Sequence, residues 1–407
     1  MTYVRKGFGL RSEVRSLLAA DYSGQLVDLL RASDHTLSVG GVTIRLAREF
    51  GFCYGVDRAV DYAYQTRAKF PDKRIFLVGE IIHNPHVNTR LREMGVEFLL
   101  PVQKPDGTTG FDFSAIGADD MVIIPAFGVT IADFQTLREL GCVLVDTTCG
   151  SVLNVWKRVD NYARDGFTAL IHGKHYHEET RATASQVQRH PGGAWIVVRD
   201  MAEARIVCDY IEGRGDRDEL LRRFAPAVSP GFDPDVHLQR VGVANQTTML
   251  ARESLAIGEE VGASFERRYG ADHRREHFRT FDTICSATQD RQDAIVDLLK
   301  EPLDVMLVIG GYNSSNTMSL AALCAEKVRT YHVEDADGID PARGTVRHKP
   351  VGVAGEEETP DWLAGDAPIR VGITAGASTP NNKIGEAVAR ILATRGIEAG
   401  AIAGVGS

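Results

Sequence analysis

The sequence predicts an α/β fold made of three similar units with largely parallel sheets. Along the chain, strand-like apolar runs alternate with helical patterns across short connections, which is typical of α/β proteins. The second observation is a repeat. Three cysteines each follow a strand-like run and precede a helical stretch, which leads to another apolar run ending in glycine and a polar cluster. The cysteines are Cys53, Cys149 and Cys285, and the clusters are at 79–84, 173–177 and 310–316.

The spacing within this repeat is almost constant. The first cysteine precedes His83 by 30 residues, and the other two precede His177 and Asn313 by 28 residues each. Cysteines are often core residues, but burial alone does not explain a shared spacing. Ligands of parallel sheets bind at the carboxyl ends of the strands. We therefore expect the polar clusters to share one face and the three thiols to converge on one point.

The strands are recognised by their apolar content. The run at 42–47 alternates, with Val42, Ile44 and Leu46 on one face, which is typical of a half-buried strand. The other runs are short and almost wholly apolar, as buried strands are. They are at 74–78, 121–125, 142–145, 169–171, 195–198, 241–244, 305–309 and 369–373.

The repeat also sets the expected domain boundaries. The chain begins with a mixed, weakly helical stretch that we expect to pack on the outside. A charged and then Pro-rich stretch in the second unit indicates a surface insertion, and residues 339–367 are predicted to be rich in loops. The expected divisions are an N-terminal extension at 1–41, a first α/β unit at 42–148, a second at 149–284 with its insertion at 213–239, a third at 285–395, and a flexible tail at 396–407.

Composition narrows the class of protein. A chain of 407 residues with 43% hydrophobic and 25% charged residues is typical of a globular protein of two or three domains. The net charge of −9 argues against nucleic-acid binding. Six cysteines are too few for a disulfide scaffold, and no run approaches the roughly 20 apolar residues of a membrane span. We expect a cytoplasmic protein with no nucleic-acid or membrane partner.

Three thiolates at helix starts suit a metal centre, because a helix N-terminus stabilises a thiolate. Iron–sulfur clusters usually take four cysteines, so three would leave one iron open for substrate. Structural zinc sites favour close Cys-x-x-Cys pairs, which this sequence lacks. The other three cysteines do not share the repeat, and we expect each of them in the core. They are Cys142, Cys208 and Cys324.

The polar clusters indicate an anion site with a proton donor. Residues 313–316 and 374–380 place hydroxyls and amides where helices should begin, and helix N-termini bind phosphate. With His83 and His177 at comparable strand ends, these segments favour a phosphate or diphosphate cradle. Glu179 is a candidate general acid, and the stretch that contains Thr247 offers a hydroxyl. His172 and His175 show no distinguishing feature.

Seven motifs follow one another along the chain: Gly51-Phe52-Cys53-Tyr54-Gly55-Val56-Asp57-Arg58-Ala59, Gly79-Glu80-Ile81-Ile82-His83-Asn84-Pro85, Asp146-Thr147-Thr148-Cys149, Gln246-Thr247-Thr248, Ile284-Cys285-Ser286-Ala287-Thr288-Gln289, Asn313-Ser314-Ser315-Asn316 and Thr374-Ala375-Gly376-Ala377-Ser378. Together they resemble the 4-hydroxy-3-methylbut-2-enyl diphosphate reductase family of the non-mevalonate isoprenoid pathway. The resemblance runs from about residue 42 to about residue 392. The segment at 3–9 resembles the N-terminal extension of the cyanobacterial and plant branch.

The resemblance implies a trefoil-like, pseudo-threefold arrangement of the units around a central [4Fe–4S] cluster with three cysteine ligands and one open iron. The family removes the hydroxyl of its allylic diphosphate as water, using two electrons and two protons, and forms isopentenyl and dimethylallyl diphosphate. Glu179 matches the proton-relay carboxylate, and Thr247 matches the hydroxyl near the substrate oxygen. The ligating positions match Cys53, Cys149 and Cys285, and the diphosphate-binding positions match His83, His177, Ser314, Ser315, Asn316 and Ser378.

One position departs from the family pattern. Many bacterial members carry a diphosphate-binding histidine where this chain has Phe127. A phenyl ring cannot donate a hydrogen bond to phosphate, so that role is not carried over. Lys174 or His175 is our candidate for the missing donor.

Two other functions stay open at the level of sequence: a zinc-dependent hydrolase with Glu179 as base, and an iron–sulfur sensor without turnover. The chain shows no Gly-x-Gly-x-x-Gly fingerprint for a nicotinamide or flavin. Electrons should therefore arrive from a partner, and the family expectation is reduced ferredoxin or flavodoxin. The protein is expected to be a monomer or homodimer.

Overall fold

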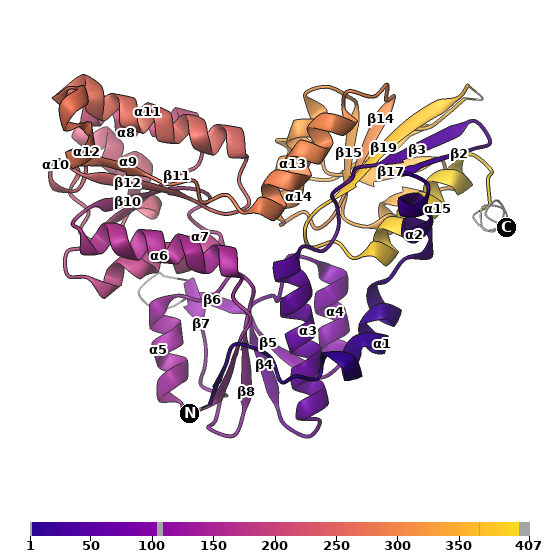
Figure 1. Cartoon of the computed structure of the whole chain (residues 1–407), viewed down its shortest axis with the longest axis horizontal. Helices are drawn as coiled ribbons and strands as arrows, with labels where there is room; N and C mark the ends of the chain where they lie inside the picture. Colours follow the sequence, from indigo (N-terminus) through magenta and orange to yellow (C-terminus); the bar gives the residue numbers. More distant parts are fainter. Residues whose placement is uncertain (1, 104–108, 366, 399–407) are drawn as a thin grey trace. The chain divides into compact units, whose positions relative to one another are not determined.

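A computed structural model of the protein defines residues 2–103, 109–365 and 367–398 (Figure 1). The chain divides into two compact lobes. The first lobe contains Met1–Gly7, Phe70–Ile81 and Arg92–Cys285, and the second lobe contains Phe8–Lys69, Ile82–Leu91 and Ser286–Ser407.

Sheet 1 lies in the first lobe and has the strand order β1-β9-β8-β4-β5, with every pair parallel. Its central strands β4 and β8 are buried along their whole length, as continuous apolar runs in parallel sheets are. The helices and strands in this part of the first lobe, which include the separate pair β6-β7, are β1 (Tyr3–Val4), β4 (Ile75–Val78), β5 (Val96–Leu99), β6 (Pro101–Gln103), β7 (Thr109–Phe111), β8 (Met121–Ile124), α5 (Ile131–Glu139) and β9 (Val143–Asp146).

Sheet 2 also lies in the first lobe, with the order β11-β10-β12-β13 and only parallel pairs. Val155, Val159 and Tyr162 form the buried face of helix α6 and enter the core of this sheet. The elements are α6 (Gly150–Arg164), β10 (Thr168–His172), α7 (Glu178–Ser185), η1 (Gln186–Arg189), β11 (Trp195–Val198), α8 (Met201–Ile211), α9 (Arg217–Phe224), η2 (Ala225–Ala227), α10 (Pro234–His237), β12 (Val241–Asn245), α11 (Ala251–Tyr269), η3 (Ala271–His273), α12 (Arg274–His277) and β13 (Phe278–Thr280).

Sheet 3 lies in the second lobe and has the order β15-β14-β19-β3-β2, in which only β2 is antiparallel. Figure 1 shows the indigo strands β2 and β3 beside the yellow strand β19. The helices and strands of the whole second lobe are α1 (Arg11–Tyr22), α2 (Gln25–Ala32), β2 (Thr36–Val39), β3 (Val42–Leu46), α3 (Tyr54–Lys69), most of α4 (Pro85–Glu93), α13 (Ser286–Leu298), β14 (Val305–Ile309), α14 (Ser315–Ala325), β15 (Thr330–Val333), η4 (Ala336–Gly338), β16 (Ile339–Asp340), β17 (Thr345–His348), β18 (Glu357–Pro360), β19 (Ile369–Ala375) and α15 (Asn381–Thr394).

Each of the three sheets contains the same arrangement of four parallel strands at its core. Its strand order is β9-β8-β4-β5 in sheet 1, β13-β12-β10-β11 in sheet 2 and β3-β19-β14-β15 in sheet 3. In each core a repeat cysteine follows the first strand of this order, and a polar cluster follows the third. The predicted fold of three similar α/β units is therefore confirmed, as are all nine predicted strands.

The expected unit boundary at residue 42 is wrong for its first strand. β3 pairs with β19 in sheet 3, so it completes the third unit and not the first. The alternating apolar pattern identified the strand, but its partner lies at the far end of the sequence, where local pattern gives no information. The third unit is thus a circularly permuted copy of the other two.

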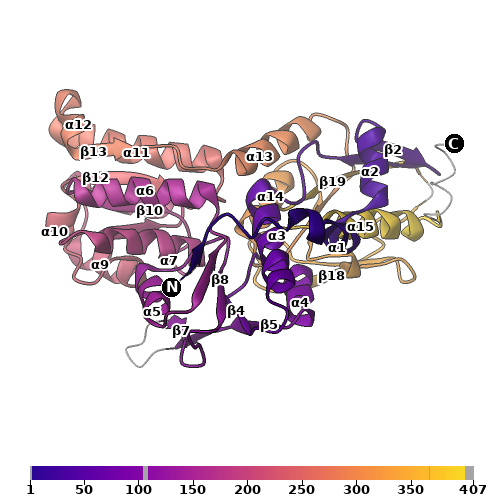
Figure 2. The same cartoon turned by 60° about the horizontal axis from the view of Figure 1, so that its bottom comes forward.

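The N-terminal extension is more than an outer layer. Strand β1 pairs with β9 in sheet 1, and β2 forms the edge of sheet 3. Val27 and Leu30 of α2 are fully buried in the core of sheet 3. Helix α1 lies beside α3 in both views (Figures 1 and 2).

Two segments expected as surface loops are ordered. Residues 213–239 carry α9 and α10, and they bury Leu220, Phe224 and Phe232 in the core of sheet 2. Residues 339–367 contain the antiparallel sheet β16-β17-β18. The first segment was expected to be a surface insertion because its few apolar residues stand among charged residues and prolines in the sequence. Most of the expected tail, 399–407, lies outside the described residues. No helix in the described ranges is long and apolar enough to cross a membrane.

Candidate active site

The three repeat cysteines share one backbone contact. Each cysteine N–H donates to a carbonyl just beyond the end of the neighbouring parallel strand of its own sheet. The sheets therefore build the same cysteine position three times, as the sequence repeat predicted. The N···O distances are 3.1 Å from Cys53 to Ala377, 2.9 Å from Cys149 to Ala126 and 3.4 Å from Cys285 to Thr247.

Each repeat cysteine also stands at the start of a helix. Cys149 is the N-cap of α6, and Cys53 and Cys285 directly precede α3 and α13. All three are partly exposed. Polar N–H groups at these helix starts favour anionic ligands such as thiolates.

The other three cysteines are buried, which confirms their predicted core placement. Burial raises the pKa of the Cys142 thiol, and it raises the pKa values of Cys208 and Cys324 to about 12. These side chains therefore remain neutral thiols and are poor metal ligands, because the thiolate is the ligand form.

A buried carboxyl group and a threonine are joined by hydrogen bonds in the first lobe. Glu179, in the first turn of α7, is only 1% exposed. Its Oε1 accepts from the Thr247 N–H at 2.6 Å, and its Oε2 accepts from the Thr247 hydroxyl at 3.1 Å. The Thr247 carbonyl also accepts from the Cys285 N–H. Glu179, Thr247 and Cys285 are thus joined by hydrogen bonds.

His177 has a defined ring orientation. It caps α7, and its Nδ1 accepts from the Glu179 N–H at 3.2 Å. In the neutral ring the proton must then sit on Nε2, which leaves Nε2–H as the donor. The ring of Phe127 meets the His177 ring edge-on, with centroids 5.6 Å apart. Phe127 therefore packs against His177, a residue expected to bind the diphosphate, and does not itself donate a hydrogen bond.

Gln246 organises this part of the site, a role that the sequence did not reveal. Its Oε1 accepts from the Lys174 N–H and from the Thr180 hydroxyl, both at 3.1 Å, and its Nε2 donates to Thr248 at 2.9 Å. Gln246 thus ties the loop after β10 to the loop after β12. The signal in the sequence is its place in the motif Gln246-Thr247-Thr248.

The side chains predicted to form an anion cradle lie in the second lobe, at the carboxyl ends of the parallel neighbours β14 and β19. Ser314 caps α14 by accepting from the Thr317 N–H at 3.3 Å. Asn316 accepts at Oδ1 from the Ala377 N–H at 2.9 Å, which joins the start of α14 to the loop before α15. Ser315 is 3% exposed, and among the described residues its buried hydroxyl has no hydrogen-bond partner. An unpaired buried hydroxyl at a helix start is able to donate a hydrogen bond to an anion.

His83 and Ser378 belong to the same cradle. The Ser378 hydroxyl donates to the His83 carbonyl at 3.1 Å, and the Asn313 amide Nδ2 lies 3.3 Å from His83 Nδ1. Because an amide NH₂ only donates, Nδ1 accepts, and the neutral ring again carries its proton on Nε2. His83 and His177 therefore both offer an Nε2–H donor.

Close packing fixes the cradle loops. A Cβ at Gly376 would lie 2.0 Å from Thr317 Oγ1, and a Cβ at Gly310 would lie 2.6 Å from Thr379 Oγ1. Gly310 also has a φ of +147°, which disfavours residues with a side chain. These glycines let the strand ends approach α14 closely.

His172 and the candidate replacements for the Phe127 donor have other surroundings. His172 is buried in β10 beside Ser254, with 2.8 Å between Nδ1 and Oγ, and burial lowers its pKa to about 4. It is a core residue. The His175 ring packs edge-on against Tyr176. The assignment of Lys174 or His175 as the substitute donor stays a prediction.

These features define an α/β protein in which a cysteine stands at the start of a helix beside each of the three sheets, with a buried carboxyl group in one lobe and a polar cluster at the start of α14 in the other. The chain belongs to the LytB protein family, whose model matches residues 44–392.

Relatives and solved structures agree with this assignment. A 4-hydroxy-3-methylbut-2-enyl diphosphate reductase of Thermosynechococcus vestitus is 48% identical over 97% of this chain and 95% of its own length. The enzyme of that name from Gloeobacter violaceus is 46% identical over 100% and 96%. The cyanobacterial likeness is confirmed, and the latter match includes the N-terminal extension.

Among solved structures, an (E)-4-hydroxy-3-methyl-but-2-enyl diphosphate reductase has 28% identity and a TM-score of 0.51, covering 86% of this chain and 98% of its own. The Plasmodium falciparum E-1-hydroxy-2-methyl-but-2-enyl-4-diphosphate reductase has a TM-score of 0.62 at 18% identity, covering 85% and 86%, and it shows the shared fold.

Proposed function

We propose that this chain is an iron–sulfur oxidoreductase that converts (E)-4-hydroxy-3-methylbut-2-enyl diphosphate to isopentenyl and dimethylallyl diphosphate, the last step of the non-mevalonate pathway. The allylic C–O bond breaks, two electrons and two protons enter, and the oxygen leaves as water. Beside family membership, the hydrogen-bonded series Glu179–Thr247–Cys285 supports this proposal most strongly, because it joins an acid to a metal-ligand candidate.

The residues present fit an iron–sulfur cluster. Cys53, Cys149 and Cys285 are partly exposed sulfurs in equivalent positions, and soft thiolates are the usual ligands of such clusters. We assign them as the three ligands of a [4Fe–4S] cluster with one iron that lacks a protein thiolate. When bound, the cluster supplies electrons to the allylic C–O bond.

The cradle would hold the diphosphate. Helix starts at α14 and α15, the unpaired Ser315 hydroxyl and the Nε2–H groups of His83 and His177 all favour phosphate oxygens. Ser314, Asn316 and Ser378 position the backbone around that anion. Holding the charged end fixes the direction in which the hydroxylated end points.

Glu179 and Thr247 would deliver protons. Both Glu179 oxygens bond to Thr247, so the Thr247 hydroxyl offers a path by which a proton held by the carboxyl group can move toward the substrate. Burial of the pair excludes bulk water from that path. Proton transfer by a positioned side chain contributes about 10²- to 10⁴-fold to a rate.

The remaining assignments concern the cell. We assign reduced ferredoxin or flavodoxin as electron donor, the cytoplasm as location, and a monomer or homodimer as the working form. The absence of a Gly-x-Gly-x-x-Gly fingerprint in the sequence supports an external electron source.

Anaerobic iron and sulfide analysis of cysteine variants tests the ligand assignment. The unaltered chain should hold about four irons, as a cubane cluster requires. Cys285→Ala should lose iron, whereas Cys208→Ala, which alters a buried thiol of the same lobe, should keep it. Zinc without iron in the unaltered chain, or equal iron in both variants, would overturn the assignment.

A further inference from the structure

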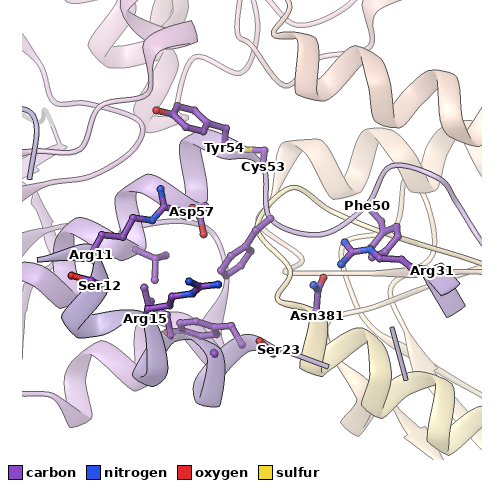
Figure 3. A pocket seen from close by; sticks show the side chains of 15 residues that line it. Arg11, Ser12, Arg15, Ser23, Arg31, Phe50, Cys53, Tyr54, Asp57 and Asn381 are labelled. Carbon is purple, nitrogen blue, oxygen red and sulfur yellow. Dashed lines mark hydrogen bonds and ion pairs between the residues drawn. The ribbon is translucent and has the colours of Figure 1, made fainter. Parts of the chain in front are cut away.

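A cavity of about 810 Å³ lies in the second lobe beside the N-terminal helices (Figure 3). Its lining comes from α1 and α2 of the N-terminal extension, from α3 and the loop that precedes it, and from the start of α15. Apart from the cluster ligand Cys53, no residue that lines this cavity has a role in the proposed chemistry. The wall residues on which the argument depends are Arg11, Arg15, Arg31, Cys53, Tyr54 and Asp57.

The cavity is positively charged although the chain is acidic. Three arginines and one aspartate line it, in a chain with a net charge of −9. Arg11 pairs with Asp57 at 2.8 Å and Arg31 with Asp28 at 3.8 Å, and the Arg31 guanidinium also lies 4.7 Å from the Phe50 ring centroid. Arg15 is exposed on α1 and has no ion-pair partner among the described residues. A local positive field on a negative molecule steers acidic partners to one place.

Cys53, one of the assigned cluster ligands, is part of the same wall. The next residue, Tyr54, is 78% exposed, which is unusual for a large aromatic side chain. Exposed tyrosine and arginine side chains are the commonest anchors of protein–protein interfaces. Electrons that enter here would reach a cluster ligand directly.

We propose that this cavity and its arginine rim are the docking surface for an acidic one-electron carrier protein. The inference rests on the proposed function, which consumes two electrons and has no internal cofactor fingerprint to supply them. Charge complementarity identifies the partner class, and the presence of Cys53 in the wall identifies the surface.

A second basic surface in the first lobe provides a matched comparison. It surrounds a cavity of about 600 Å³ and includes Arg158, Arg275, Arg279 and Phe281. As on the first surface, some of these groups are already engaged: Arg279 pairs with Asp165, and Arg158 stacks on Phe281. No repeat cysteine lines it. On charge alone, this second surface would be the better candidate for docking the carrier. The surface near α1 combines positive charge with a cluster ligand, and we therefore prefer it.

The test measures turnover with two electron sources in Arg15→Gln, Arg15→Glu and the control Arg275→Glu. With reduced methyl viologen, a small cation that needs no docking surface, all three should match the unaltered chain. With a reduced acidic [2Fe–2S] ferredoxin at low salt, KM for ferredoxin should rise about tenfold in Arg15→Glu and less in Arg15→Gln, because rim charges act on association. Added salt should reduce these differences.

Calorimetric titration with the same ferredoxin gives a readout that does not depend on turnover. The Kd should rise in Arg15→Glu and stay constant in Arg275→Glu. An unchanged Kd and KM in Arg15→Glu, or a larger effect in Arg275→Glu, would overturn the inference. A raised KM for the diphosphate substrate in the viologen assay would overturn it in favour of a small-anion site. Absence of viologen-driven turnover in every protein would instead refute the proposed function, and the titration would still decide the docking surface.

Discussion

Glu179 is the side chain on which the proposed protonation depends. Its carboxyl group is buried, and both of its oxygens are engaged by Thr247. Glu179→Gln keeps the shape and one acceptor but removes the transferable proton. We expect kcat to fall about 10²- to 10⁴-fold with iron content and substrate affinity nearly unchanged. Anaerobic kinetics with reduced methyl viologen measure this.

Thr247 provides the control for that experiment. Thr247→Ser keeps the hydroxyl and should retain most activity, whereas Thr247→Val should behave like Glu179→Gln. A Glu179→Gln enzyme with full turnover would show that protons arrive by another route.

Ser315 and Ser314 are neighbours with different expected effects. Removing the unpaired Ser315 hydroxyl should leave thermal stability unchanged or slightly higher, since no protein hydrogen bond is lost. Ser315→Ala should still raise KM by about 10- to 150-fold, the equivalent of one hydrogen bond to a charged group. Ser314→Ala should cost about 1 kcal/mol of stability, because it removes the α14 cap. Thermal unfolding and kinetics of both variants separate the two roles.

For single residues of the site, the sequence predicted which residues belong to it better than it predicted the contacts between them. The repeat identified three cysteines because spacing along a chain is visible in it. The Phe127–His177 ring contact and the Gln246 bonds join residues that are 50 to 72 positions apart, so local pattern carried no trace of them.

The start of α14 is the element that shapes the cradle. A Cβ at Gly376 would lie 2.0 Å from Thr317 Oγ1, so Gly376→Ala must push α14 away from the β19 end. We expect a loss of about 1–3 kcal/mol of stability, typical of overpacking, and weaker binding of inorganic diphosphate. Gly355→Ala is the control, because nothing lies within 4 Å of its Cβ position. Equal stability and diphosphate affinity in the two variants would contradict this account of the cradle.

Strands with strong apolar runs were predictable, and weak ones were not. β14 and β4 are buried at every position, so composition alone identified them. β18 is Glu-Glu-Thr-Pro and mostly exposed, and it exists because it pairs with β17. Pairing of polar strands depends on tertiary context, which intrinsic strand preference does not include.

For the whole molecule, two buried histidines should make stability depend on pH. Burial lowers the pKa values of His172 and His332 to about 4, against about 6.5 for an exposed histidine. Between these values the unfolded chain binds protons that the folded chain does not. Stability should therefore be complete above about pH 6.5 and fall as the pH drops toward 4, by up to about 3 kcal/mol for each histidine. Urea unfolding of the metal-free protein from pH 7 to pH 4.5 measures this.

His332→Gln should flatten that dependence. The His332 Nε2 donates to the Gly310 carbonyl at 2.9 Å, and a glutamine amide can replace this bond without titrating. The variant is expected to be less stable at pH 7 but to lose less on acidification. An identical pH slope in the variant would show that other groups control acid unfolding.

The number of α/β units could be predicted from the sequence, but the pairing of strands that lie far apart along the chain could not. Three similar units followed from the repeat, yet the third sheet takes β3 from near the start of the chain, where it pairs with β19 near the end. Local sequence fixes which face of a strand is apolar but not which distant strand it joins. The integration of the N-terminal extension into sheets 1 and 3 was missed for the same reason.

Anaerobic turnover of (E)-4-hydroxy-3-methylbut-2-enyl diphosphate, driven by reduced methyl viologen, tests the central claim most directly. We expect both isopentenyl and dimethylallyl diphosphate from the iron-loaded chain, with their formation nearly abolished by Glu179→Gln. Iron-loaded protein that binds the substrate but releases neither product would contradict it.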